Sequence, residues 1–159
     1  MNDEILSYAA KLVETLKAKS LKIATAESCT GGMVSGYITA VPGASEVFEM
    51  GVTSYSNRIK NKFLNVNGEI LDTKGAVSRD TAKQMAENIR SLSGADIGVS
   101  VTGVAGPAPQ DGYSAGTVFV GICYDGETQV SKLQITPKDR NYVREQTVLK
   151  LFGLILENI

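Results

Sequence analysis

The stretch ATAESCTGG, residues 24–32, lies between a short apolar run and a helical pattern, and it carries the most information about the fold. The apolar run at 21–26 predicts a buried strand, and residues 29–41 are expected to form a helix. Ser28 and Thr30 are therefore expected where a strand turns into a helix. The first N–H groups of a helix have no partner within it and carry partial positive charge. Such a junction can activate a hydroxyl nucleophile or bind an anion.

Length and composition indicate one globular domain over residues 1–159. The chain is 43% apolar and 21% charged, which suffices for a hydrophobic core. Its net charge of −1, without a long basic run, argues against nucleic acid as a partner. No apolar segment is long enough to span a bilayer, so no membrane partner is expected. The acidic N-terminus opens an amphipathic helix, which is not typical of a secretory signal. Cys29 and Cys123 are expected to be reduced thiols in a cytoplasmic protein.

The chain contains no histidine, and this absence limits its chemistry. A Ser-His-Asp or Cys-His site cannot form within the chain. Histidine-ligated zinc is excluded, and two cysteines cannot make a structural zinc site alone. We therefore expect neither a metal nor another cofactor. Any general base must be a lysine, tyrosine, aspartate, glutamate or thiolate.

The alternation of helical and strand patterns predicts an α/β fold, specifically a three-layer α/β/α sandwich with a mixed, mainly parallel sheet. Further helices are expected at 3–19, 56–64, 78–92 and 139–157, and strands at 48–55, 95–101, 117–124 and 128–135. Asp125-Gly126 indicates a hairpin and Asn67-Gly68 a turn. Ser78 is expected to cap the third of these helices, whose inner face would hold Ala82, Met85, Ala86, Ile89 and Leu92.

Three polar loops follow predicted strands, and ligands of such sheets bind at the carboxyl ends of parallel strands. The loops are 25–32, 55–60 and 102–107, and we expect them to converge. Without histidine, a lysine with a lowered pKa, or a tyrosinate beside it, can accept the proton of a serine. Ser28, Tyr55 and Lys60 would then form a relay of the serine–lysine type, whose natural chemistry is amide hydrolysis.

Several of these residues also have structural interpretations. Ser28 could cap the helix, and Thr30 is expected to be a cap or to orient the backbone. Cys29 could be a nucleophile or a small core residue. Glu27 is expected to pair with a loop amide or a lysine. A non-catalytic nucleotide-binding or regulatory module that uses the same loops is the alternative to an enzyme.

Four blocks of this sequence resemble the signature blocks of the CinA C-terminal domain family, whose stand-alone members are nicotinamide-nucleotide amidohydrolases. They are TAESCTGG at 25–32, YSNRIK at 55–60, GAVS at 75–78 and TGVAGP at 102–107, in the order and spacing of the family. The resemblance covers essentially the whole chain. It implies the three-layer fold and the hydrolysis of nicotinamide mononucleotide to nicotinate mononucleotide and ammonia.

The resemblance also implies roles for individual residues. The family's nucleophile falls on Ser28, and its assisting tyrosine and lysine fall on Tyr55 and Lys60. Implied substrate contacts are Cys29, Thr30, Gly31, Thr102, Gly103, Ala105 and Gly106, with Arg140 as a phosphate contact. A small-molecule nucleotide is the implied partner, and relatives suggest a homo-oligomer, a dimer or a higher assembly. Many relatives carry a larger N-terminal domain, which is not expected here.

One stretch departs from the family pattern. Relatives usually have a Lys-Pro pair before the Gly-Thr that opens the next strand. Here residues 109–117 keep Gly116-Thr117 but have Tyr113-Ser114 in place of that pair. If the lysine of the relatives contacts substrate, we expect a change in affinity or specificity in this chain.

Overall fold

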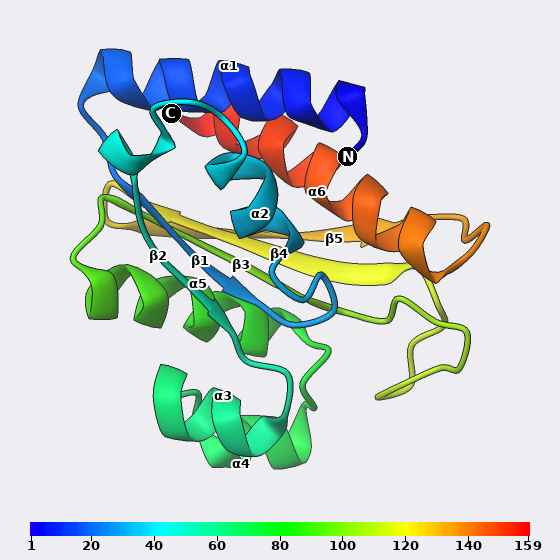
Figure 1. Ribbon diagram of the computed structural model, residues 1–159. Helices are drawn as coiled ribbons and strands as arrows, with labels where there is room; N and C mark the ends of the chain where they lie inside the picture. Colours follow the sequence, from blue (N-terminus) through cyan, green and yellow to red (C-terminus); the bar gives the residue numbers. More distant parts are fainter.

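The computed structural model covers residues 1–159 and arranges them in three layers (Figure 1). A five-stranded sheet forms the middle layer. Helices α1 (Asp3–Lys19), α2 (Met33–Thr39) and α6 (Arg140–Asn158) cover one face. Helices α3 (Asn57–Leu64), α4 (Gly68–Thr73) and α5 (Arg79–Ser93) lie on the other face. The expected α/β/α sandwich is therefore confirmed.

The order of the strands places the ends of the parallel strands side by side. The sheet runs β2-β1-β3-β4-β5. Its strands are β1 (Ile23–Glu27), β2 (Phe48–Thr53), β3 (Ile97–Gly103), β4 (Thr117–Tyr124) and β5 (Glu127–Gln134), with a short 3-10 helix η1 (Ala44–Glu46) before β2. Strand β1 pairs in parallel with β2 and β3, whereas β4 is antiparallel to both β3 and β5. The polar loops after β1, β2 and β3 consequently leave the sheet at one edge.

The register of β1 fixes where the chain leaves the sheet. Glu27 lies opposite Thr53 of β2 and Val101 of β3. The next peptide group continues this pairing, since the Ser28 N–H donates to the Val101 carbonyl at 2.9 Å. Ser28 is thus held by the backbone at the sheet edge, between the other two loops.

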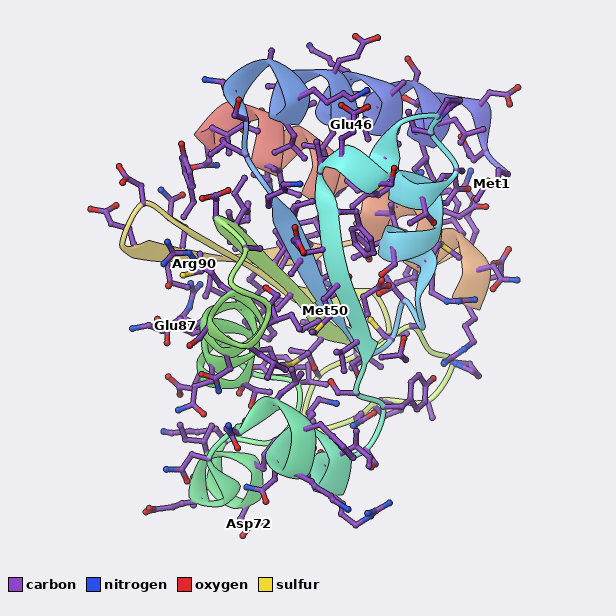
Figure 2. The ribbon with its side chains drawn as sticks, turned by 60° about the vertical axis from the view of Figure 1, so that its left-hand side comes forward. Met1, Glu46, Met50, Asp72, Glu87 and Arg90 are labelled. Atoms are coloured by element: carbon purple, nitrogen blue, oxygen red, sulfur yellow. The ribbon has the colours of Figure 1, made fainter.

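Two apolar interfaces hold the layers together. The larger has 25 buried residues, which lie between the sheet and α1, α2 and α6. A cluster of nine buried residues joins the sheet to α3, α4 and α5, and Met50 of β2 packs against it. Figure 2 labels Met50 on β2, where it is half-buried, and Asp72 on α4, where it is exposed. None of the helices combines the length and apolar character of a membrane span.

Most local signals in the sequence are confirmed. The Ser78 side chain accepts the Thr81 N–H at the start of α5, and Gly94 ends that helix in the left-handed conformation. Asp125 and Gly126 both have positive φ, 49° and 80°, as a tight hairpin between β4 and β5 requires.

Three local expectations are wrong. Helix α2 begins at Met33, not near residue 29, because the chain first makes a turn after β1. The Asn67-Gly68 pair begins the short helix α4, with the Asn67 side chain accepting the Glu69 N–H. Leu92 is 55% exposed. Leu92 is rotated by only about 60° around the helix axis from Ile89, so it lies at the margin of the buried face. It is exposed because it belongs to the last turn of α5, just before the C-cap Gly94.

Candidate active site

The three polar loops line one cleft of about 500 Å³ at the edge of the sheet. Loop one contributes Ser28 and Cys29, and loop two contributes Tyr55, Ser56, Asn57 and Lys60. Residues 102–110 form most of a third side, and Ala76, Val77 and Arg140 complete the lining. The expected convergence of the three loops is therefore present.

Ser28 and Lys60 meet at the bottom of this cleft. The Nζ of Lys60 lies 3.0 Å from Ser28 Oγ and 2.7 Å from the carbonyl oxygen of Ser54. The side chain reaches this place because Ser56 caps α3 and puts Lys60 in the first turn of the helix, beside the end of β2. Only 1% of Lys60 is exposed, although it belongs to a polar helix.

The surroundings of Lys60 favour its neutral form. Both hydrogen-bond partners of its Nζ are uncharged oxygens, and Lys60 forms no ion pair. Burial is the largest influence and lowers the pKa of Lys60 to about 8, against smaller opposing effects from Cys29 and Asp111. A neutral amine at this distance can accept the proton of the Ser28 hydroxyl.

The side chain of Glu27, the residue before Ser28, stabilises the start of helix α2. Its carboxylate is buried and accepts the N–H groups of Gly32 at 3.0 Å, Val34 at 3.0 Å and Ser35 at 2.9 Å. It also accepts the Ser35 hydroxyl at 2.8 Å. The expectation that Glu27 pairs with loop amides is confirmed. Glu27 also replaces a conventional cap, since the N-cap of α2 is Gly32 and Ser28 is not the cap.

The turn after Ser28 leaves two backbone donors free. The N–H groups of Cys29 and Thr30 donate to no backbone carbonyl, whereas the Gly31 N–H donates to the Ser28 carbonyl at 3.0 Å. Arg144 of α6 holds the same turn, because its Nη2 donates to the Thr30 carbonyl at 2.8 Å. Two free N–H groups directly after a serine hydroxyl are donors of the kind that stabilise an oxyanion. Thr30, an implied substrate contact, is fully buried and does not line the cleft, and its hydroxyl has no hydrogen-bond partner.

Cys29 lines the cleft but is not prepared to act as a nucleophile. Burial raises the pKa of its thiol to about 12, so the thiol stays protonated at neutral pH. Only the thiolate is strongly nucleophilic. The environment of Cys29 therefore favours the interpretation of a small core residue.

Loop three is shaped mainly by contacts within the protein. The Thr102 hydroxyl donates to the Ala76 carbonyl at 2.7 Å. A Cβ on Gly103 would lie 2.7 Å from Val118, so this glycine permits close packing against β4. Ala105 is buried, and Gly106 has a φ of 92° that favours glycine. Gly31 lies on the exposed side of the first turn and does not line the cleft.

Arg140 bridges two of the loops across the cleft. Its Nη1 donates to the Gly106 carbonyl at 2.6 Å, and its Nη2 donates to the Tyr55 hydroxyl at 2.7 Å. The structure thus forms the Ser28–Lys60 contact of the expected relay. The Tyr55 phenol hydrogen-bonds to Arg140 and to neither member of that pair.

Tyr113 and Ser114, which stand in place of the Lys-Pro pair of the family pattern, do not line the cleft. The ring of Tyr113 packs edge-on against the ring of Phe119, with 5.4 Å between the ring centres. The Lys132 ammonium lies 4.9 Å from the centre of the Tyr113 ring. Asp111 fastens the same loop, because its carboxylate accepts the Val77 N–H at 2.9 Å.

Sequence reasoning missed several parts of the site. The Ser54 carbonyl contacts Lys60 through the main chain, for which a sequence carries no side-chain signal. Ala76 and Val77 line the cleft, and their place in the GAVS block was the available signal. No group of three or more histidine, cysteine, aspartate or glutamate side chains is arranged to hold a metal ion.

Comparison with known proteins agrees with this fold. A family model described as the CinA C-terminal domain matches residues 5–159. The chain is 45% identical over 159 residues to a protein of Geobacillus sp. (strain WCH70) named competence-damage inducible protein, covering 99% of this chain and 38% of that one. A protein of the same name from Caldanaerobacter subterraneus is 43% identical over 145 residues, which cover 91% of this chain and 35% of that one. The chain thus spans somewhat more than a third of the length of these relatives.

Solved structures give the same result. The competence/damage inducible protein CihA from Agrobacterium tumefaciens superposes with a TM-score of 0.93 and 33% identity, covering 97% of this chain and 94% of that one. A competence or damage-inducible protein from Enterobacter asburiae has a TM-score of 0.93 and 33% identity, covering 97% of each chain.

Proposed function

Because the chain belongs to the CinA C-terminal domain family, and because its cleft pairs a serine with a buried lysine, we propose that it is a serine amidohydrolase. The proposed reaction converts the carboxamide of nicotinamide mononucleotide to the carboxylate of nicotinate mononucleotide and releases ammonia. The observation that carries the proposal is the 3.0 Å contact between Lys60 Nζ and Ser28 Oγ, with no carboxylate paired to the lysine.

In the proposed first step, neutral Lys60 takes the hydroxyl proton while Ser28 Oγ attacks the carboxamide carbon. The carbonyl oxygen becomes an oxyanion, which the N–H groups of Cys29 and Thr30 would receive. The lysine ammonium then gives its proton to the departing nitrogen, which leaves as ammonia. The product of this step is an ester between Ser28 and the nicotinoyl group.

In the second step, water replaces the leaving group. Neutral Lys60 removes one proton from the water molecule, and the resulting hydroxide attacks the ester carbon. The same amide donors hold the second oxyanion, and the proton returns to Ser28 Oγ as the ester breaks. The acid is released and the Ser28–Lys60 pair is restored.

Substrate choice in this proposal depends on Arg140. Its guanidinium faces the cleft and forms no ion pair, so its charge is available for an anionic group of the ligand. The phosphate of nicotinamide mononucleotide is such a group, which supports the substrate that the family resemblance implies.

The deciding experiment measures ammonia release from nicotinamide mononucleotide by the purified chain and by Ser28→Ala. We expect turnover by the wild type and at least about a thousandfold loss in the variant, as for removal of a nucleophile. Ser45→Ala, an exposed serine of η1, is the matched control and should retain full activity. Ligand-induced thermal stabilisation without ammonia release would instead indicate a binding module.

A further inference from the structure

We infer that Tyr55 is a positioning residue for Arg140, and that it serves recognition of an anionic group rather than proton transfer at Ser28. The identity of that group as a substrate phosphate rests on the proposed function. The contacts that support the inference do not depend on it.

Two hydrogen bonds fix the Arg140 guanidinium, and each uses a different nitrogen atom as the donor. The Gly106 carbonyl holds Nη1 at 2.6 Å, and the Tyr55 hydroxyl holds Nη2 at 2.7 Å. Since these acceptors belong to separate loops, together they set the plane of the guanidinium across the cleft. A guanidinium has five N–H donors, so three remain for a ligand.

The Ser28–Lys60 pair is complete without Tyr55. Lys60 Nζ donates to Ser28 Oγ and to the Ser54 carbonyl, so Ser28 Oγ already has a hydrogen-bond partner in Lys60. The Tyr55 side chain is 60% exposed and its hydroxyl contacts only Arg140. Tyr55 thus lies at the rim of the cleft, and Lys60 lies at the bottom.

Removal of the phenol oxygen should therefore affect binding more than chemistry. In Tyr55→Phe the guanidinium keeps only the Gly106 carbonyl and can turn about that contact. We expect KM for nicotinamide mononucleotide to rise about tenfold, the scale of one lost hydrogen bond. We expect kcat to change less than KM and the midpoint of the pH profile to stay where it is in the wild type. For nicotinamide riboside, which lacks the phosphate, Tyr55→Phe should lower kcat/KM less than it does for nicotinamide mononucleotide.

A double-mutant cycle with Tyr55→Phe, Arg140→Met and the double variant tests the coupling. The binding readout is calorimetry with ribose 5-phosphate, and ribose serves as the uncharged comparison. We expect the wild type to prefer ribose 5-phosphate, each single variant to weaken its binding, and the double variant to be no weaker than Arg140→Met. Tyr8→Phe, a partly exposed tyrosine of α1 outside the cleft, is the control and should bind as the wild type does.

The inference is overturned by additive losses in the cycle, by a wild type that does not prefer ribose 5-phosphate to ribose, or by a Tyr55→Phe variant that loses kcat with a shifted pH profile. Failure of the proposed function looks different. If the wild type releases no ammonia but the binding losses are non-additive, the role of Tyr55 stands and the amidohydrolase proposal falls.

Discussion

Lys60 Nζ lies between the Ser28 hydroxyl, at 3.0 Å, and the Ser54 carbonyl, at 2.7 Å. The lysine therefore has two neutral oxygen partners and no carboxylate to stabilise its charge. In this respect the contact differs from an ion pair, which would raise the pKa of a lysine. Activity and stability should both depend on the charge of Lys60.

Activity should rise with pH. Because burial lowers the pKa of Lys60 to about 8, the neutral amine is a minor form at pH 7 and the major form above pH 8. We expect kcat/KM for nicotinamide mononucleotide to rise about tenfold per pH unit below the midpoint and to level off above it. The measurement is a pH profile of ammonia release. Lys60→Met should remove nearly all activity, and a flat profile between pH 6 and 9 in the wild type would contradict the role of Lys60.

Stability should also rise with pH in the alkaline range. The folded protein binds the Lys60 proton more weakly than the unfolded chain, with a pKa of about 8 against a reference of 10.5. The penalty is complete below pH 8 and disappears as pH rises through 10.5. From pH 7 to pH 10, the free energy of unfolding of the wild type should increase relative to Lys60→Met by about 2 kcal/mol. Urea denaturation of the two proteins in parallel tests this, and an unchanged difference would show that burial does not perturb Lys60.

Glu27→Gln should destabilise the protein. The carboxylate accepts three backbone N–H groups and one hydroxyl, whereas an amide would direct its own N–H groups at some of these donors. We expect a loss of about 2 kcal/mol in the free energy of unfolding, measured by urea denaturation. Glu14→Gln on the exposed side of α1 is the control and should change stability by less than about 0.5 kcal/mol. Equal effects of the two substitutions would contradict the capping role of Glu27.

The thiol of Cys29 should be dispensable. Since burial raises its pKa to about 12, iodoacetamide should leave the proposed ammonia release by the native protein unchanged over hours at pH 7.5. Cys29→Ala keeps the backbone N–H of residue 29 and should retain activity within about fivefold, because only a small buried side chain is shortened. Rapid inactivation by the reagent, prevented by substrate, would instead favour a cysteine nucleophile.

Arg144→Met should lower turnover with little effect on affinity. The guanidinium holds the Thr30 carbonyl at 2.8 Å, and the N–H of the same residue is one of the two free donors beside Ser28. Loosening this turn should lower kcat about tenfold, which is less than the effect of removing one oxyanion donor completely. KM should stay near its wild-type value. Arg58→Met, an exposed residue of α3, is the control. A rise in KM without a fall in kcat would assign Arg144 to substrate binding.

Local patterns predicted most of the fold. The strand and hairpin signals of residues 117–134 depend on neighbours in sequence, and the structure follows them. The start of α2 was not predictable in this way, since its cap is the side chain of Glu27, five residues before Gly32. Helix α4 was missed because its six residues are too few to show a helical period.

The site was less predictable than the fold. The loop pattern predicted Lys60 beside Ser28, and the structure has this contact. The polar pattern of α3 did not indicate that the whole side chain is buried, which follows from the packing of the first turn of α3 against the end of β2. The partner of Tyr55 is 85 positions away in the sequence, and no local pattern connects them. Sequence therefore identified which loops form the cleft and which lysine meets Ser28, but not that Tyr55 hydrogen-bonds to Arg140.

Adjacent residues Glu27 and Ser28 direct their side chains to opposite sides of the sheet, the first to α2 and the second to Lys60 of α3. Saturation mutagenesis with separate measurements of cellular abundance and turnover should therefore give different results at these two neighbouring positions. Substitutions at position 27 would lower the abundance of the protein, whereas substitutions at position 28 would leave a folded protein without turnover. Because adjacent side chains of a strand point to opposite faces, one of these two neighbouring residues determines stability and the other determines the proposed reaction.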